Sequence, residues 1–332
     1  MRAACLAAAL GLAASGALAE PGRPLLAIGD AAPPLSIERW LRGAPVERFE
    51  RGTVYVLDFW AVWCGPCLSG MAHTSDLADR FRDRRVRVIA LTGPDDSGNT
   101  LEAVERTLSR RGSTMRFDVA WDAPVAPGTP PYLDVLRGRT TVRYFKDAQL
   151  DGLPMAAIID RQRRLAWVGL PSALEAPLTA IVEGRWDMRA AAQRDRARRL
   201  AEPKLDELRA HYAAGRHDEG HALARSLTEG PFRDEPGYLR LVATLLVGER
   251  AAPTARDKDL ALAAADRAAA LTDLADDTVL VALARVYFVR GDLEGAVAAQ
   301  EAALALMDPP LPRQAAILDS YRNALVTGAA RR

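Results

Sequence analysis

The segment that most constrains the fold is WCGPC at residues 63–67, which closely follows an apolar run. That run, TVYVLDFW at residues 53–60, is rich in β-branched and aromatic residues and has the length of a buried strand. Apolar residues after it recur at helical spacing, so we expect a helix from about Cys64 to about Arg84. The sequence therefore predicts two cysteines at the junction of a strand and a helix.

Each residue type in this segment has a chemical reason. Cysteines three residues apart in a first helical turn share one face, close enough for a disulfide to form and break. The partial positive charge of the helix N-terminus stabilises a thiolate at Cys64. We therefore expect Cys64, at the exposed end, to be the nucleophile and Cys67, one turn deeper, to be the resolving thiol. Pro66 is tolerated in the first turn, and Gly65 lets a substrate backbone approach.

The same cysteine spacing is also half of a zinc site, which needs a second pair of cysteine or histidine ligands. The chain has 3 cysteines and 4 histidines. His217 and His221 stand four residues apart, but their charged neighbours predict exposed positions on a helix. We expect His73 to be a surface residue on the helix of the dithiol. The ligands are too few for zinc, so we expect neither a metal nor a cofactor.

The N-terminus has the parts of a secretory signal peptide: a basic start, an apolar run and the small-x-small site ALA at residues 17–19. We expect cleavage after Ala19, which removes Cys5 and leaves only the dithiol. The apolar run is too short to span a bilayer, and a leader retained as an anchor is the alternative. The sequence therefore predicts an exported protein, periplasmic in a cell that has a periplasm.

Charge gives no case for a nucleic acid or an anionic membrane as a partner, because 44 basic residues face 43 acidic ones. The densest basic stretch is residues 185–199, which hold six arginines. An anion-binding patch is one interpretation of this stretch. We favour a solvated helix face, since Asp187 and Asp195 are interspersed among the arginines.

Strand-like and helix-like segments alternate up to about residue 186, which predicts an α/β unit with a mixed central sheet. Asn99 and Ser172 each precede a glutamate by three residues, a spacing typical of capped helix starts. The other expected elements are a small hairpin within 35–49, a strand at 86–92, a loop at 121–131, and a hairpin of 155–160 with 165–168.

After Met188 no strand-like run appears, and the apolar residues follow a helical period. Residues 277–310 resemble a tetratricopeptide repeat, with a departure at Gln300, where a large apolar residue is usual. Looser units span 238–271 and 205–227, and a last helix is expected at 314–325. The predicted domains are a signal peptide (1–19), an α/β domain (20–187) and an all-α, repeat-like domain (188–332). A non-repetitive helical bundle is the alternative for the last.

Residues 58–67 (DFWAVWCGPC) resemble the active-site segment of thioredoxin, and residues 24–186 resemble the exported TlpA/ResA-like branch of that family. The resemblance implies a thioredoxin-like mixed sheet flanked by helices. It also implies that Asp58 is a buried carboxylate beneath the dithiol, able to relay a proton to or from Cys67. Trp63, Gly65 and Pro66 would then lie on the surface that meets the substrate.

A second resemblance is Gly152-Leu153-Pro154, directly before a strand. In the family this proline follows a cis peptide bond and faces the dithiol, and the residue before it hydrogen-bonds the substrate like an added strand. Two positions depart from the family. Gly70 stands where many exported relatives have a glutamate, and Met155 follows the proline where threonine is common.

These features predict an exported thiol–disulfide oxidoreductase, and the Gly-Pro pair resembles reducing members, which favours a disulfide reductase. Attack by Cys64 would give a mixed disulfide, which Cys67 would resolve. The alternatives are an oxidase or isomerase with the same residues, and a non-catalytic helical binding module that carries a thioredoxin domain. The expected partners are a protein disulfide substrate, a membrane or periplasmic thiol reductant, and a protein bound by the helical domain.

Overall fold

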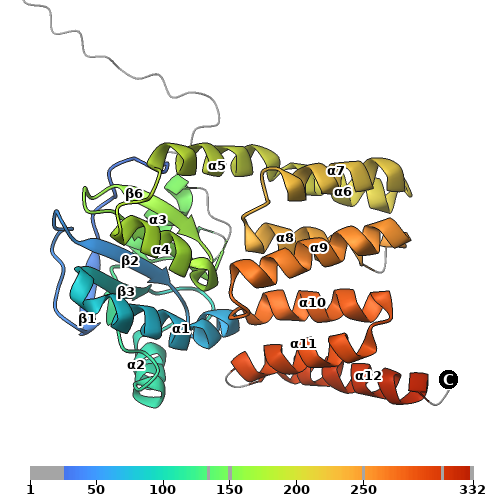
Figure 1. The fold of residues 1–332 in the computed structure, drawn as a ribbon. Helices are drawn as coiled ribbons and strands as arrows, with labels where there is room; N and C mark the ends of the chain where they lie inside the picture. The colour runs from blue at the N-terminus through green and yellow to red at the C-terminus, as the bar shows by residue number, and fades with distance from the viewer. Residues whose placement is uncertain (1–25, 133–134, 149–151, 249–250, 308–309, 330–332) are drawn as a thin grey trace, which may run out of the picture.

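The computed structural model describes residues 26–132, 135–148, 152–248, 251–307 and 310–329. Figure 1 shows an α/β unit and a stack of helices side by side, with helix α5 (Met188–Ala201) running from one to the other. The predicted signal peptide lies outside the described residues. Within the described ranges, no helix is both long and apolar enough for a membrane span.

The α/β unit is built on one mixed sheet with the strand order β1-β4-β3-β2-β5-β6. Strands β2, β3 and β4 run parallel, whereas β1, β5 and β6 each pair antiparallel with their neighbours. This confirms the predicted mixed sheet. The strands are β1 (Ile37–Arg42), β2 (Val54–Phe59), β3 (Val86–Thr92), β4 (Asp118–Asp122), β5 (Met155–Ile159) and β6 (Leu165–Gly169).

Helices cover both faces of the sheet because strand β2 is apolar on both. Val54 and Val56 pack in one core with α1, α2 and α4, while Tyr55, Leu57 and Phe59 pack in the other with α3 and the start of α5. The helices of this unit are α1 (Gly65–Phe81), α2 (Leu101–Arg111), α3 (Arg139–Ala148) and α4 (Glu175–Val182), with short 3-10 turns η1 (Arg82–Arg84) and η2 (Pro171–Ala173).

Two sequence-based expectations for this unit are wrong. The segment 35–49 does not form a hairpin with itself: its strand β1 pairs with β4, about eighty residues later. The predicted loop at 121–131 begins inside β4, and helix α3 was not predicted. The cause is non-local pairing, because β4 is a short strand held between β1 and β3, and local patterns do not record such partners.

The predicted cap of α2 is displaced by one residue. Thr100, not Asn99, is the N-cap, and its hydroxyl accepts the Ala103 N–H. Asn99 is buried instead, and its amide nitrogen donates to the Thr92 hydroxyl and the Gly93 carbonyl. The Asn99 side chain therefore stabilises the loop that follows β3 and does not cap the helix.

The helical half stacks as antiparallel pairs with one shared core (Figure 1). Its helices are α6 (Lys204–Ala213), α7 (His217–Glu229), α8 (Pro236–Leu246), α9 (Ala255–Leu271), α10 (Asp277–Arg290), α11 (Leu293–Leu306) and α12 (Pro312–Ala329). Each predicted helix pair is present, and Gly291 makes the α10–α11 turn at φ 85°. Buried Gln300 donates from its amide to Gln314 on α12 at 3.0 Å, so a polar contact replaces the usual apolar one. That the pairs are tetratricopeptide repeats stays a prediction.

Helix α5 belongs to both halves, although the predicted boundary at 187/188 coincides with its N-cap, Asp187. Met188 and Ala191 pack on the sheet, whereas Ala201 joins the core of the helical half. The prediction that the arginines of this helix form a solvated face is wrong for Arg198. Arg198 is buried, donates to Asp195 at 2.9 Å and reaches the Tyr238 hydroxyl on α8 at 2.9 Å. Burial follows because α5 lies between the two halves.

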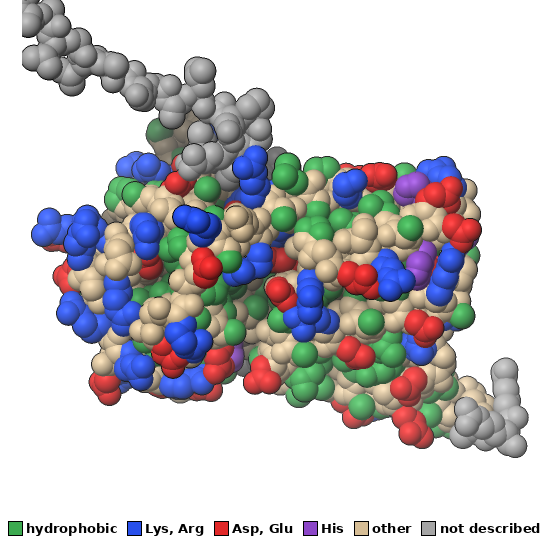
Figure 2. All heavy atoms as spheres, turned by 45° about the horizontal axis from the view of Figure 1, so that its top comes forward, with side chains coloured by type: hydrophobic (Ala, Val, Ile, Leu, Met, Phe, Trp, Pro, Cys, Tyr) green, Lys and Arg blue, Asp and Glu red, His purple; other side chains and the backbone are tan. Residues whose placement is uncertain are grey.

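Charges of both signs are interspersed over the face of the molecule in Figure 2. Many of them meet in surface ion pairs, such as Arg225 with Glu229 and Arg322 with Glu301. This mixing agrees with the balanced composition of 44 basic and 43 acidic residues.

Candidate active site

Cys64 and Cys67 form a disulfide at the N-terminus of α1. Cys64 is the N-cap residue, and its Sγ accepts the Cys67 backbone N–H at 3.2 Å. Pro66 occupies the first turn, where no intrahelical hydrogen bond is lost. The sulfur of Cys64 thus lies where a thiolate would be stabilised by a backbone donor and the helix dipole.

Both cysteines are buried, which contradicts the expectation that Cys64 is exposed. The exposed fraction is 4% for Cys64 and 6% for Cys67. The helical half lies against this end of α1: a Cβ added at Gly65 would stand 4.0 Å from Leu311, just before α12. Trp63 beside them stays 43% exposed. The expected difference in solvent exposure between Cys64 and Cys67 is therefore absent in this structure.

Asp58 lies beneath α1, as the resemblance implied. It is 5% exposed and points to the α1 side of the sheet, and Thr74 donates its hydroxyl to the carboxylate at 3.2 Å. Thr74 is seven residues after Cys67 and so shares its helix face. Burial raises the pKa of Asp58 to about 7, against a smaller lowering by the Thr74 hydroxyl. A carboxyl group with this pKa can both take and give a proton near neutral pH.

A network that the sequence did not reveal holds the segment before the cysteines. Trp63 donates its indole N–H to Asp95 at 2.5 Å. Asp95 also accepts the backbone N–H of Ser97 and Asn99, and the side-chain amide oxygen of Asn99 accepts the Val62 backbone N–H at 2.8 Å. The one hint in the sequence was a cluster of polar residues directly after a buried strand, at its carboxyl end.

The bond between Leu153 and Pro154 is cis, as the resemblance implied. Strand register explains its place: Met155 on β5 pairs with Phe59 on β2. Pro154 therefore lies beside the end of β2, from which the chain continues to the cysteines. Pro154 and Pro66 line the same cavity, so the structure brings together the two segments that the sequence placed about ninety residues apart.

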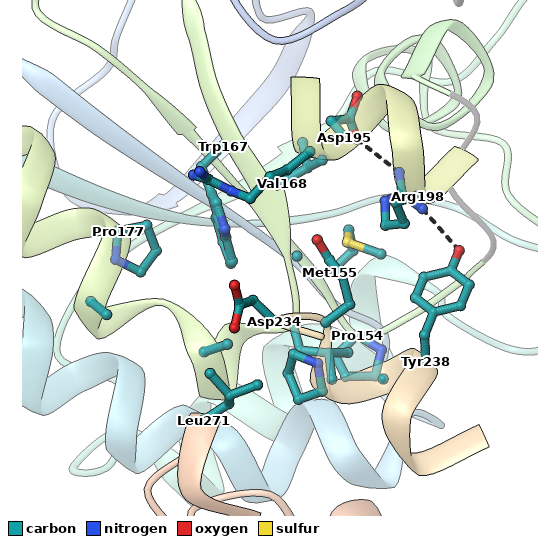
Figure 3. A pocket seen from close by; sticks show the side chains of 18 of the residues that line it. Pro154, Met155, Trp167, Val168, Pro177, Asp195, Arg198, Asp234, Tyr238 and Leu271 are labelled. Carbon is teal, nitrogen blue, oxygen red and sulfur yellow. Dashed lines mark hydrogen bonds and ion pairs between the residues drawn. The ribbon is translucent and has the colours of Figure 1, made fainter. Parts of the chain in front are cut away.

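The two departures from the family have different surroundings. A Cβ added at Gly70 would meet nothing within 4 Å, so the position that is a glutamate in many relatives faces open space. Met155 lines the same cavity as Pro154 (Figure 3). Its thioether, in place of a threonine hydroxyl, gives this edge of the cavity an apolar side chain.

The histidines are less exposed than the sequence suggested. The Nε2 of His73 is buried and lacks a partner within the described residues, and burial is the main cause that lowers the pKa of His73. His221 lies 3.0 Å from the carboxylate of Asp257, which is fully buried on α9. His217 lies 4.0 Å from the same carboxylate. His217 and His221 are less exposed because α7, which carries them, packs against α9. Over the described ranges, no cluster of three metal-ligating side chains occurs.

Two hydroxyls of the α/β unit hold the start of α10. Ser69, on α1, donates to Asp277 at 3.2 Å. Ser172, in η2, donates to Asp276 at 2.7 Å, so it joins the two halves rather than capping α4 as predicted. These contacts set the helical half beside the dithiol helix.

Curated proteins resemble this chain over part of their length, while no family model matches it. Protein FixW of Rhizobium leguminosarum is 24% identical over 168 residues, which are 48% of this chain and 68% of FixW. The thiol-disulfide oxidoreductases ResA of Bacillus thuringiensis and Bacillus anthracis are each 31% identical over 83 residues, which are 25% of this chain and 44% of ResA. This chain thus spans less than half of the length of the ResA relatives.

Solved structures match about half of the chain. A thiol-disulfide isomerase from Corynebacterium glutamicum is 21% identical and covers 47% of this chain and 97% of its own, with a TM-score of 0.37. The thioredoxin domain of a thiol-disulfide oxidoreductase from Bacteroides vulgatus is 16% identical and covers 49% of this chain and 99% of its own, with a TM-score of 0.36.

The sheet topology, the disulfide of the CxxC pair and the similarity to ResA agree on the class of the α/β unit. It is a thioredoxin-like unit of the thiol–disulfide oxidoreductase type, as the sequence predicted. The roles of the individual site residues stay predictions.

Proposed function

We propose that this chain is an exported disulfide reductase that acts through Cys64 and Cys67. The observation that carries the proposal is the disulfide at the N-terminus of α1 above buried Asp58. The Cys64 thiolate attacks a substrate disulfide, which gives a mixed disulfide and releases one substrate thiolate. Cys67 then attacks Cys64, which releases the second thiolate and leaves the enzyme disulfide. Two electrons pass from the dithiol to the substrate.

Asp58 supplies the proton movement for the second step. With a pKa near 7, its carboxylate form takes the Cys67 proton, and the acid form returns a proton when the enzyme is reduced again. Trp63, Gly65 and Pro66 on one side, with Leu153 and Pro154 on the other, hold the substrate segment against Cys64.

The direction of exchange depends on the reduction potential. We expect a value near −270 mV, roughly that of a thioredoxin-type reductant, rather than about −120 mV, typical of a strong oxidant. Equilibrating the full-length protein with glutathione or dithiothreitol buffers measures this value. An oxidising potential would favour the alternative oxidase or isomerase instead.

Export is supported by the composition of residues 1–19. Cell fractionation with N-terminal sequencing tests it: we expect a mature chain that begins at Glu20. A chain that retains its leader in the membrane fraction would make this protein an anchored one with the same dithiol outside the membrane.

The helical half is expected to bind the protein partner. Stacked helix pairs build extended surfaces that suit protein segments, and this one stands beside the dithiol through Asp276 and Asp277. A Cys67→Ser variant should trap the partner as a mixed disulfide with Cys64. If the Cys67→Ser variant traps no partner covalently but still binds one without a disulfide, the alternative of a non-catalytic binding module is favoured.

A further inference from the structure

A cavity lies between the two halves, next to the dithiol loop. Pro66 and Pro154 line it from the α/β unit. Asp234 and Tyr238 line it from the helical half, opposite Pro154 in Figure 3. Its volume is about 560 Å³, within the roughly 300–1,000 Å³ of small-ligand clefts.

Most acids in the wall of this cavity already have cationic partners. Asp195 accepts from Arg198 and from Arg199, at 2.9 and 2.8 Å. Asp234 forms an ion pair with Arg267. The walls therefore offer little free negative charge to a substrate.

Glu235 is the remaining acid of the wall. Burial is the main cause that raises the pKa of Glu235 to about 7, and the nearby cation of Arg198 opposes that shift. Glu235 is therefore about half protonated near neutral pH, so its negative charge is reduced as well.

Arg240 on α8 differs from the other cations of the cavity. Its Nε is buried without a hydrogen-bond partner in the described parts of the chain. The carboxylates of Asp276 and Asp277 attract the Arg240 guanidinium through space. Both are already occupied by other donors, the Ser172 and Ser69 hydroxyls. A buried guanidinium donor without an acceptor is costly, and a carboxylate is its best geometric match.

A second cation, Arg194, lies at the exposed edge of the same cavity, where it stands over the ring of Trp186. The cavity thus has positive charge both at its edge and in its wall. This arrangement is complementary to a negatively charged segment.

We propose that Arg240 binds a carboxylate of the substrate, so that the enzyme prefers disulfides flanked by an acidic residue. This inference rests on the proposed reductase function, and it gives the helical half a direct part in choosing the substrate. The substrate segment lies between Pro154 and α8, with its cystine toward Pro66 and its acidic side chain toward Arg240.

The test uses the full-length protein and two cystine peptides that differ only by Glu or Gln beside the cystine. Because a hydrogen bond to a charged group contributes about 1.5–3 kcal/mol, we expect kcat/KM to be about tenfold or more higher for the Glu peptide. Arg240→Gln should bring the ratio near one, mainly through KM, and Arg240→Lys should keep part of it. Arg225→Gln, a surface arginine of α7 paired with Glu229, is the matched control and should keep the full ratio.

Equal rates for the two peptides with the wild-type protein would overturn the inference, and this arm needs no variant. An Arg240→Gln variant that slows both peptides alike would also overturn it, because Arg240 would then only balance Asp276 and Asp277. If the Arg240→Gln variant still prefers the Glu peptide over the Gln peptide, the inference is overturned as well.

Binding separates this inference from the proposed function. The Kd of serine analogues of the two peptides, measured with Cys64→Ser protein, reports on Arg240 without any redox step. If the Glu analogue binds more tightly and the preference is lost with Arg240→Gln, the inference stands even where the wild-type protein reduces neither peptide and the reductase proposal fails.

Discussion

Each half of the molecule buries an aspartate, and the two carboxyl groups have opposite pKa shifts. Asp58 in the α/β unit has one neutral hydroxyl donor, so burial prevails and raises its pKa to about 7. Burial also acts to raise the pKa of Asp257 in the helical half. There, hydrogen bonds from Thr254, Tyr212 and His221 outweigh it and lower the pKa.

The difference separates a reactive carboxyl group from a structural one. Asp257 is fully satisfied and joins α6, α7 and α9, including the capping box with Thr254. Asp58 is left poorly solvated and lies under the helix that carries the dithiol. Under-satisfied buried acids of this kind are typical of catalytic sites, whereas satisfied ones hold structure.

The largest expected effect is on the thiols, which only the α/β unit supplies. Cys64→Ser should reduce disulfide exchange to the background rate, because the thiolate that attacks the substrate disulfide is lost. Insulin or model-peptide reduction with a thiol donor measures it. Ser109→Ala, which removes an exposed hydroxyl bonded within its own helix, serves as the control and should retain activity; an active Cys64→Ser protein would contradict the mechanism.

The next effect compares the two aspartates. Asp58→Asn should slow exchange by roughly 10²-fold at neutral pH, the lower range for a lost general acid–base group. The inflection near pH 7 in the rate profile should disappear with it. Asp257→Asn, its counterpart in the helical half, should lower the melting temperature but leave that inflection in place. If Asp58→Asn and Asp257→Asn have the same pH–rate profile, the distinction between a reactive and a structural aspartate is wrong.

Stability should depend on pH in opposite directions for the two acids. The folded pKa of Asp58 is raised, so its protonated form stabilises the fold below about pH 4, and this stability is lost as the pH rises through about 7. Asp257 has a lowered pKa, so its contribution is present above about pH 4 and is lost as the pH falls below that. Urea unfolding of the Asp→Asn variants from pH 3 to pH 8 tests both signs.

The expected result is that Asp58→Asn stabilises the protein most at pH 8 and least at pH 3. For Asp257→Asn the destabilisation should be large at pH 7 and shrink toward pH 3. Equal pH dependence in the two variants and the parent would show that neither carboxyl group changes its proton affinity on folding.

The smallest effect concerns the contact between the halves. Removing the hydroxyls of Ser69 and Ser172 should weaken docking of α10 by about 0.5–1.5 kcal/mol for each hydrogen bond. In the reduced protein, alkylation of buried Cys64 should then become a few times faster. Ser226→Ala, which removes a hydroxyl bonded within its own helix, should leave the alkylation rate unchanged. If the double variant also leaves it unchanged, these contacts do not limit access to the dithiol.

Local sequence patterns were sufficient for elements whose residues interact with near neighbours. Strands 53–60 and 86–92, the dithiol helix and the helix pair at 277–310 all have the predicted place. The strand at 118–122 was missed because its partners, β1 and β3, are distant in sequence. Ser172 was assigned to a cap because its spacing to Glu175 suits one, while its real partner, Asp276, is about a hundred residues away.

For the site, the residue types determined the chemistry. Two cysteines three residues apart at the start of a helix can form a disulfide in any fold that keeps this helix, and strand register then brings Pro154 beside it. The predicted exposure of Cys64 was wrong because a residue at a helix end can still pack into a core, and Cys64 joins the core on the α1 side of the sheet.

By itself, then, the sequence determined the dithiol and its helix, because helical spacing is a local consequence of covalent geometry. The acid beneath the dithiol was implied by the family resemblance. Only the tertiary structure decided that α8 and α10 stand beside the dithiol and that Arg240 faces the cavity they enclose. Those contacts join residues more than a hundred positions apart, and their stability comes from burial and from hydrogen bonds that exist only after both halves have folded and packed together.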